Sequence, residues 1–271
     1  MLRASSFYDF EQSKGREMSL FKIKRFFRRA MRNSKEYRAD GMRVRNKNFG
    51  FLVEEEFSAA WATMLSGEHG PRRAEKFFNG NVPDIRWRAH INCWAAATAS
   101  RLEGDFVELG TATGIQAGTI CAFLDFAKQK RNFFLFDTFA GIPEIDGMTD
   151  AEKSYARSSN STFYFDCFEA VSQNFKKYDN VKITRGILPE ALNTVAIEKI
   201  AYMHIDLNNA AAEIKSFEIL FPKVVPGAIV ILDDYAFAGH ENQYLRWNNF
   251  LKDKKIQIAT LPTGQGIFIK T

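Results

Sequence analysis

The sequence predicts an α/β protein built on a mostly parallel sheet that closes with an antiparallel hairpin. From residue 105 onward, short apolar runs alternate with stretches long enough for helices, which is typical of a parallel sheet covered on both faces. The last two apolar runs, 256–261 and 267–270, are joined by a turn too short for a parallel crossover. With 271 residues, 46% of them hydrophobic, the chain has ample material for a packed core.

Residues 1–50 are predicted to form a basic N-terminal extension. Residues 14–47 carry 13 Lys/Arg against 3 Asp/Glu, whereas the rest of the chain carries 24 against 29. The net charge of +5 therefore belongs to the extension, and nucleic-acid binding by the main body is not expected. Residues 20–32 have the pattern of a basic amphipathic helix. We expect either peripheral contact of residues 20–38 with an anionic membrane or an acidic partner, or an extension docked on the protein's own surface.

Residues 51–103 are expected to form N-terminal helices ahead of the sheet. Phe57, Trp61 and Met64 recur at helical spacing, and a second helical run covers residues 85–99. Helices in this position can shape a substrate pocket or a homo-oligomer interface, and the sequence is compatible with both.

Residues 104–271 contain the sheet domain. Its parallel strands are expected at residues 106–109, 133–136, 181–184, 200–205 and 228–232, with helices near 116–130, 165–178, 213–221 and 241–252. A Rossmann-like sheet with a closing antiparallel hairpin is the architecture of class I S-adenosylmethionine (SAM) methyltransferases. Nicotinamide-binding Rossmann domains usually stay parallel, so an NAD-dependent oxidoreductase is the less favoured enzymatic alternative.

A cytoplasmic location is expected from three features of the sequence. Cys93, Cys121 and Cys167 are spaced too widely for a zinc site or a disulfide framework. The N-terminus lacks the apolar core of a secretory signal. No apolar run approaches the roughly 20 residues that span a bilayer.

The first predicted strand leads into a glycine-containing turn. Glu108 lies at the tip of this strand, and Gly110 and Gly114 allow the backbone to approach a ligand closely at the start of a helix. Residue 112 is Ala, so the dinucleotide pattern Gly-x-Gly-x-x-Gly is absent. The turn suits the methionine end of SAM, or else is simply a tight strand-to-helix connection.

Acidic residues follow three further strands. Asp137 is placed to bind a ribose diol, with a strand-end cap as the alternative. Asp206, Asp233 and Asp234 follow the fourth and fifth strands, whose ends are neighbours at the carboxyl edge of the sheet. Three converging carboxylates favour a Mg²⁺ site, unless one caps a helix and another is solvated.

Several stretches together resemble the macrocin O-methyltransferase (TylF-type) family, whose members are metal-dependent, SAM-using sugar O-methyltransferases. The resemblance covers about 104–271 and is carried by 136–143, 202–206, 221–235 and 261–266. It implies an acceptor hydroxyl on a glycan, a nucleotide-sugar or a glycosylated metabolite. Where many members have an acidic residue two positions after the first Asp, this chain has Asn208.

The resemblance also implies roles for individual residues. The metal ligands fall on Asp206, Asp233 and Asp234, and the general base falls on Asp206. The cofactor-binding residues implied are Glu108, Gly110, Thr111, Gly114, Asp137, Thr138 and Phe139.

Three further features remain to be placed. His240 follows the fifth strand and is a candidate to assist as a base or to contact substrate, although a lone loop histidine is more often a bystander. His204 lies inside an apolar strand and is expected to be structural. Residues 141–163 are expected to form a long loop, either a lid over the site or a surface insertion. A non-catalytic, membrane-associated module with a vestigial SAM pocket is the non-enzymatic alternative.

Overall fold

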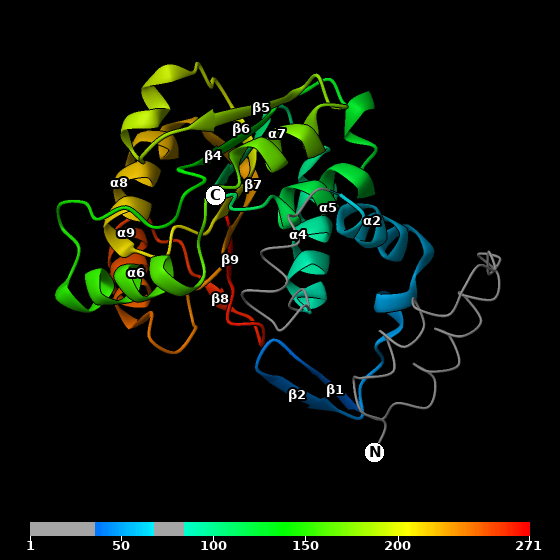
Figure 1. Ribbon diagram of the computed structural model, residues 1–271, viewed down its shortest axis with the longest axis horizontal. Coiled ribbons are helices and arrows are strands. Elements are labelled where there is room, and N and C mark those ends of the chain that lie inside the picture. Colours follow the sequence, from blue (N-terminus) through cyan, green and yellow to red (C-terminus); the bar gives the residue numbers. More distant parts are fainter. Residues whose placement is uncertain (1–35, 68–83) are drawn as a thin grey trace.

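A computed structural model describes residues 36–67 and 84–271. Its centre is a sheet of seven strands in the order β5-β4-β3-β6-β7-β9-β8 (Figure 1). The strands are β3 (Asp105–Leu109), β4 (Phe133–Asp137), β5 (Val181–Arg185), β6 (Ile200–Ile205), β7 (Val224–Leu232), β8 (Ala259–Thr260) and β9 (Gly266–Ile269). β3 to β7 are parallel, and β9 runs antiparallel to both β7 and β8. The predicted fold class is therefore confirmed.

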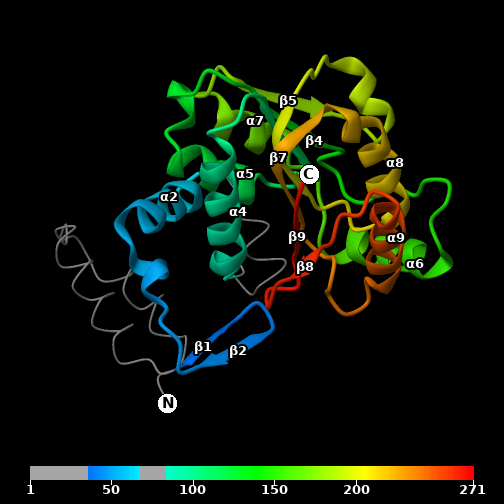
Figure 2. The same cartoon turned by 180° about the vertical axis from the view of Figure 1, so that it is seen from behind.

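Helices cover both faces of this sheet, as Figures 1 and 2 show from opposite sides. They are α2 (Glu55–Leu65), α4 (Arg86–Ala99), α5 (Ile115–Phe123), α6 (Asp150–Thr162), α7 (Phe168–Phe175), α8 (Ala210–Leu220) and α9 (Glu241–Lys252). Successive strand residues point to opposite faces, so Phe106 packs in one hydrophobic cluster and Val107 in the other. Because both faces are buried, the strands appear in the sequence as continuous apolar runs.

The two N-terminal helices belong to the same hydrophobic cluster as one face of the sheet. Phe57 of α2 and Cys93 of α4 are buried in this cluster together with Phe106 and Tyr202. α4 also contacts β6 and β7 directly. Its side chains are thereby placed within reach of the strands that carry the acidic residues.

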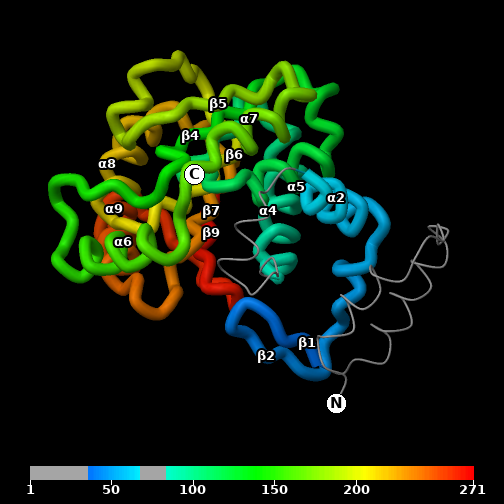
Figure 3. Tube along the Cα trace, in the orientation of Figure 1, coloured from blue at the N-terminus to red at the C-terminus, as the bar shows by residue number. Residues whose placement is uncertain are grey.

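A β-hairpin precedes these helices and was not expected from the sequence. It consists of β1 (Glu36–Ala39) and β2 (Met42–Arg45), which project beyond the α/β body in Figure 3. Asp40 and Gly41 form its turn with positive φ angles of 52° and 70°. Asp-Gly between two short extended runs is a known hairpin signal. It is present in the sequence, within the segment predicted as a basic extension.

The predicted loop at 141–163 is largely a helix, which corrects the sequence-based expectation. α6 begins with a capping box: Thr149 Oγ1 accepts from the Glu152 amide at 3.2 Å, and Glu152 Oε2 accepts from the Thr149 amide at 2.8 Å. The other Glu152 oxygen accepts from the Ala210 amide at 2.8 Å, at the start of α8. The Thr-x-x-Glu pattern that announces this helix start is present in the sequence.

The capping box gives a first testable prediction. Thr149→Ala removes a side-chain acceptor from the first turn of α6, so we expect the free energy of unfolding to fall by about 1 kcal/mol. Thr98→Ala is the matched control, because the Thr98 hydroxyl only donates to the Trp94 carbonyl within an exposed helix turn. Urea denaturation measures both variants, and equal midpoints would contradict the assigned cap.

Some sequence-based expectations lie outside the described residues. The amphipathic helix at 20–32 falls within the undescribed N-terminal segment, as does most of the proposed contact region 20–38. Among the described residues, no helix combines the length and apolar character needed to cross a membrane.

Candidate active site

The carboxyl ends of β3 and β6 meet closely because residue 110 is glycine. Gly110 has φ +89°, and a Cβ there would lie 1.8 Å from the carbonyl oxygen of Asp206. At the other end of the turn, Gly114 has φ +77° and caps α5, where a Cβ would meet the Phe175 ring at 2.6 Å. Both glycines are therefore needed for close packing within the protein, against a carbonyl at Gly110 and a ring at Gly114. The predicted approach of a ligand to this turn stays a prediction.

A partly open cavity lies at this edge of the sheet. Residues that follow β3, β4, β5 and β6 line it, including Gly110, Asp137, Thr138, Gly186, Asp206 and Asn208. The structure thus brings the glycine turn, the predicted ribose-binding acid and the first acid of the predicted metal trio to one hollow.

Asp137 holds the two loops that border this cavity. Its Oδ2 accepts from the Ala112 amide at 2.7 Å, and its Oδ1 accepts from the Phe139 amide at 2.6 Å. Burial raises the pKa of Asp137, although these hydrogen bonds oppose the shift. Thr138 Oγ1 donates to the Gly141 carbonyl, and the Phe139 ring is buried beside Phe168. These residues shape the cavity wall, and Thr111 is buried in the same turn.

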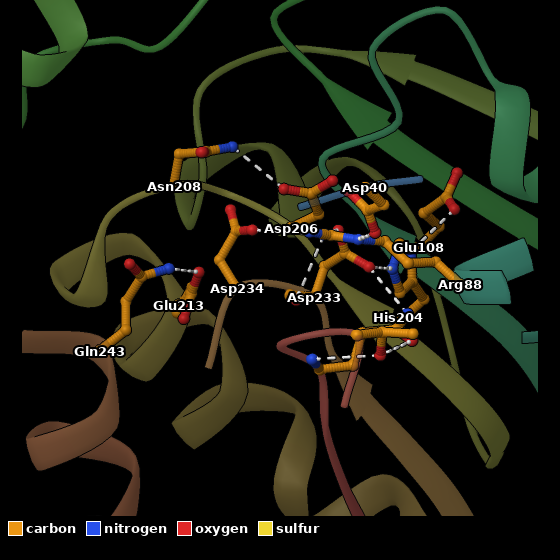
Figure 4. A network of polar contacts seen from close by, with 12 residues as sticks. Asp40, Arg88, Glu108, His204, Asp206, Asn208, Glu213, Asp233, Asp234 and Gln243 are labelled. Atoms are coloured by element: carbon orange, nitrogen blue, oxygen red, sulfur yellow. Dashed lines mark hydrogen bonds and ion pairs between the residues drawn. The ribbon is translucent and has the colours of Figure 1, made fainter. Parts of the chain in front are cut away.

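A buried chain of side chains joins the glycine turn to the acidic residues of β7. His204 Nδ1 lies 2.9 Å from Glu108 Oε1, and its Nε2 lies 3.3 Å from Asp233 Oδ1 (Figure 4). Burial alone lowers the pKa of His204, but the two carboxylates raise it to about 10, so the ring is cationic at neutral pH. His204, expected to be structural, connects two predicted site residues. Glu108 Oε2 is buried and makes no hydrogen bond to a described residue.

Arg88 of α4 compensates the charge of the acidic cluster. Its Nη1 pairs with Asp233 Oδ2 and lies 3.4 Å from Asp234 Oδ1, and its Nε pairs with Asp40 Oδ2 at 2.6 Å. The Arg88 guanidinium also lies 5.0 Å from the centre of the Phe237 ring. Figure 4 shows Arg88 between the hairpin residue Asp40 and the ends of the central strands.

The carboxyl groups of this cluster differ in their environments. Burial and the charges of Asp233 and Asp234 raise the pKa of Asp206. Burial and the charge of Asp233 likewise raise the pKa of Asp234. For Asp233, Arg88 and His204 outweigh burial and hold its pKa below the usual range. Asp233 is therefore the ionised centre of the cluster.

The carboxylate oxygens of Asp233 and Asp206 differ in how many protein hydrogen bonds they accept. Asp233 Oδ1 accepts from Gln265 Nε2 at 2.9 Å and contacts His204, and its Oδ2 is taken by Arg88. Asp206 Oδ1 accepts from Asn208 Nδ2 at 3.0 Å, and Asn208 Oδ1 accepts from the Tyr155 hydroxyl at 3.3 Å. Among the described residues, no group of three or more His, Cys, Asp or Glu side chains is arranged to hold a metal ion. Asp206 and Asp234 nonetheless offer hard oxygen donors, so the donor chemistry fits Mg²⁺.

His240 lies at the start of α9, in a second buried network. Its Nδ1 is hydrogen-bonded to Gln243 Oε1, and its ring packs edge-on against Tyr155 of α6 with a centroid distance of 5.1 Å. The His240 ring also lies 6.4 Å from the Phe237 ring, centre to centre, and the Phe237 ring lies under the guanidinium of Arg88, which pairs with the acidic cluster. α6 thus covers the acidic site through Tyr155, which contacts both His240 and Asn208.

Sequence reasoning missed Arg88, Asp40 and Gln265 as members of this site. Arg88 is separated from Asp233 by 145 positions, and its local sequence shows only a basic residue in a helix. A buried charge on the inward face of an amphipathic helix was the one available signal, because such a charge needs a partner.

Comparison with known proteins places the chain in a family. The family model described as macrocin-O-methyltransferase (TylF) matches residues 73–261. The chain belongs to this TylF family. The match begins before the sheet and includes α4, and therefore Arg88.

Characterised relatives of this TylF-family chain modify natural products. Mycinamicin III 3''-O-methyltransferase of Micromonospora griseorubida is 25% identical over 53% of this chain and 60% of its own length. Demethyldecarbamoylnovobiocin O-methyltransferase of Streptomyces niveus is 28% identical over 53% of this chain and 57% of its own length. The match thus spans less than two thirds of these relatives. The solved structure of the O-methyltransferase NovP has a TM-score of 0.62 at 19% identity, covering 80% of this chain and 96% of that one, which supports the class I methyltransferase fold.

Proposed function

We propose that this protein is a SAM-dependent O-methyltransferase that methylates a sugar hydroxyl of a glycan, a nucleotide-sugar or a glycosylated metabolite. The observation that carries the proposal is the cavity in which Gly110 and Asp137 share a wall with Asp206. A methyltransferase site needs a turn whose backbone can lie close to the cofactor. It also needs an acidic residue beside that turn to accept a proton from the acceptor. Membership of a family of O-methyltransferases supports the reaction type.

The residues of the chain divide into cofactor-holding and acceptor-facing groups. In this proposal the cofactor is held at the turn of Glu108, Gly110, Thr111 and Gly114, of which Gly110 lines the cavity. Asp137 keeps the loops of Thr138 and Phe139 in place. Bound SAM supplies an activated methyl group, so the protein chiefly has to orient the acceptor and receive its proton. Asp206 faces the same cavity and accepts that proton in this proposal.

Mg²⁺ on Asp206, Asp233 and Asp234 is the second part of the proposal. Three carboxylates at adjoining strand ends are hard ligands, and a bound divalent ion lowers the pKa of a coordinated hydroxyl. Arg88 neutralises part of the same charge, so the ion and the guanidinium compete for Asp234. Asp234→Asn is a better probe than a change at Asp233, because Asp233 also holds Arg88, His204 and Gln265.

Titration calorimetry tests the cofactor and the metal separately. We expect the chelator-treated protein to bind SAM with micromolar affinity with or without Mg²⁺, and not to bind NAD. Methyl transfer to a panel of glycosides and nucleotide-sugars is measured as the release of S-adenosylhomocysteine. We expect this transfer to require Mg²⁺. Asp234→Asn should remove the Mg²⁺ stimulation and leave SAM binding intact.

The outcomes separate the alternatives. Binding of NAD without SAM would favour the oxidoreductase. SAM binding with no transfer to any acceptor in the panel would favour the vestigial module. Full turnover after chelation would remove Mg²⁺ from the proposal and leave the methyltransferase assignment standing.

A further inference from the structure

Behind His240 lies a buried polar network that the proposed reaction does not use. Glu213 of α8 is 3% exposed and Gln243 of α9 is 2% exposed. Gln243 Nε2 donates to Glu213 Oε1 at 2.7 Å, and Trp247 Nε1 donates to Glu213 Oε2 at 2.7 Å. Figure 4 shows Gln243 and Glu213 side by side between their helices. A buried network in which every polar group is paired is rigid, so it can fix the orientation of the adjoining His240 ring.

The chemistry of these groups gives the network a direction. The indole of Trp247 can only donate, and an ionised Glu213 can only accept. The amide of Gln243 must then present its nitrogen to Glu213 and its oxygen to His240. An amide oxygen accepts, so His240 must donate from Nδ1. In a neutral imidazole this leaves the lone pair on Nε2.

The position of His240 gives that lone pair a use. The ring is 7% exposed and packs against Tyr155 of the covering helix and near Phe237, whose ring contacts Arg88 of the acidic cluster. Within the described part of the chain, no hydrogen bond occupies Nε2. A sugar acceptor has several hydroxyl groups that can donate hydrogen bonds. In the proposed reaction Asp206 accepts the proton of one of them.

We propose that ionised Glu213 and Gln243 are positioning residues that hold a neutral His240 in the Nδ1–H tautomer, so that Nε2 accepts a hydrogen bond from a second hydroxyl of the sugar acceptor. The inference rests on the proposed function for the identity of that acceptor. It makes the site selective for acceptors that carry a further hydroxyl beside the methylated one, because an acceptor lacking it leaves Nε2 without a donor.

The tautomer can be measured without substrate. Two-bond ¹⁵N–¹H correlation spectra of the imidazoles, recorded at pH 9, report which ring nitrogen carries the proton, and the chain has only 4 histidines to assign. That pH lies above the pKa of Glu213, which burial raises to about 8 against its two N–H donors. We expect Nδ1–H for His240 in the wild type and a shift toward Nε2–H in Gln243→Met. Nε2–H in the wild-type protein overturns the inference whatever the activity.

Kinetics tests the link to the acceptor. At the same pH 9, Gln243→Met is expected to raise the KM for the acceptor about tenfold, the value of one hydrogen bond, while kcat and SAM affinity stay near wild type. In the His240→Ala background the same change should add nothing, because Gln243 acts through His240. Gln173→Met, on the exposed face of α7, is the matched control.

The two proposals fail in different ways. A further rise in KM from Gln243→Met in the His240→Ala background shows a merely structural role for Gln243 and overturns the inference. Absence of methyl transfer to any sugar, with the Nδ1–H tautomer present, overturns the proposed function instead.

Discussion

Replacing Arg88 with alanine is expected to lower the free energy of unfolding by about 3–5 kcal/mol. Arg88 is 7% exposed and pairs with Asp40, Asp233 and Asp234. Its removal leaves buried carboxylates without their counter-charge, which costs far more than the loss of a pair at the surface. It also removes the ion pair between Asp40 of the β1–β2 hairpin and α4, which leaves the packing of Tyr37 on Trp87 to hold the hairpin there. Urea denaturation followed by circular dichroism measures the change.

Arg86→Ala is the matched control on the same helix. Arg86 pairs with Asp84 at 2.6 Å, but both side chains are partly exposed, at 25% and 35%. We expect this variant to lose no more than about 1 kcal/mol. Equal losses for the two arginines would show that burial of the Arg88 cluster contributes nothing to stability.

Asp206→Asn is expected to lower kcat by about 10²–10⁴-fold, the usual contribution of a general base. An asparagine keeps the shape of the side chain and removes its capacity to take a proton. SAM affinity should stay within a few-fold, because Gly110, Asp137 and Glu108 are unchanged. Stability should not fall, since the substitution removes one of three carboxylates that repel one another.

Single-turnover release of S-adenosylhomocysteine, with the best acceptor of the panel, measures this effect on chemistry. Asp166→Asn serves as the control, because Asp166 is exposed and its side chain contacts only the Arg185 side chain and the Phe168 amide among the described residues. A rate for Asp206→Asn within tenfold of the wild type would show that the base is another group.

Much of the fold was predictable because its signals are local. Each central strand is buried on both faces, so it appears as an apolar run, and the residue that ends the run lies at the carboxyl edge. The sequence therefore places Glu108, Asp137, Asp206 and Asp233 at one edge of the sheet, where the structure has them. The hairpin turn at Asp40–Gly41 and the capping box at Thr149 were equally local signals, and both were overlooked.

The residues that contact these acidic side chains could not be predicted from the sequence. The sequence predicted that converging carboxylates need a compensating charge, and it suggested a metal ion. The structure supplies Arg88 and His204 as compensating cations, while the metal site stays a proposal. Asp137, predicted to bind ribose, holds two loop amides, and its role toward a ligand likewise stays a proposal.

The sequence by itself determined which side chains stand at the edge of the sheet, since strand periodicity and the position of the last apolar residue are encoded in neighbouring residues. Only the tertiary structure decided what those side chains touch. The helix with Arg88, the strand with His204 and the helix with Gln243 come together through burial of apolar faces that are far apart in the sequence. Hydrogen bonds and ion pairs depend on distances of a few ångströms between such segments, and no local pattern specifies them.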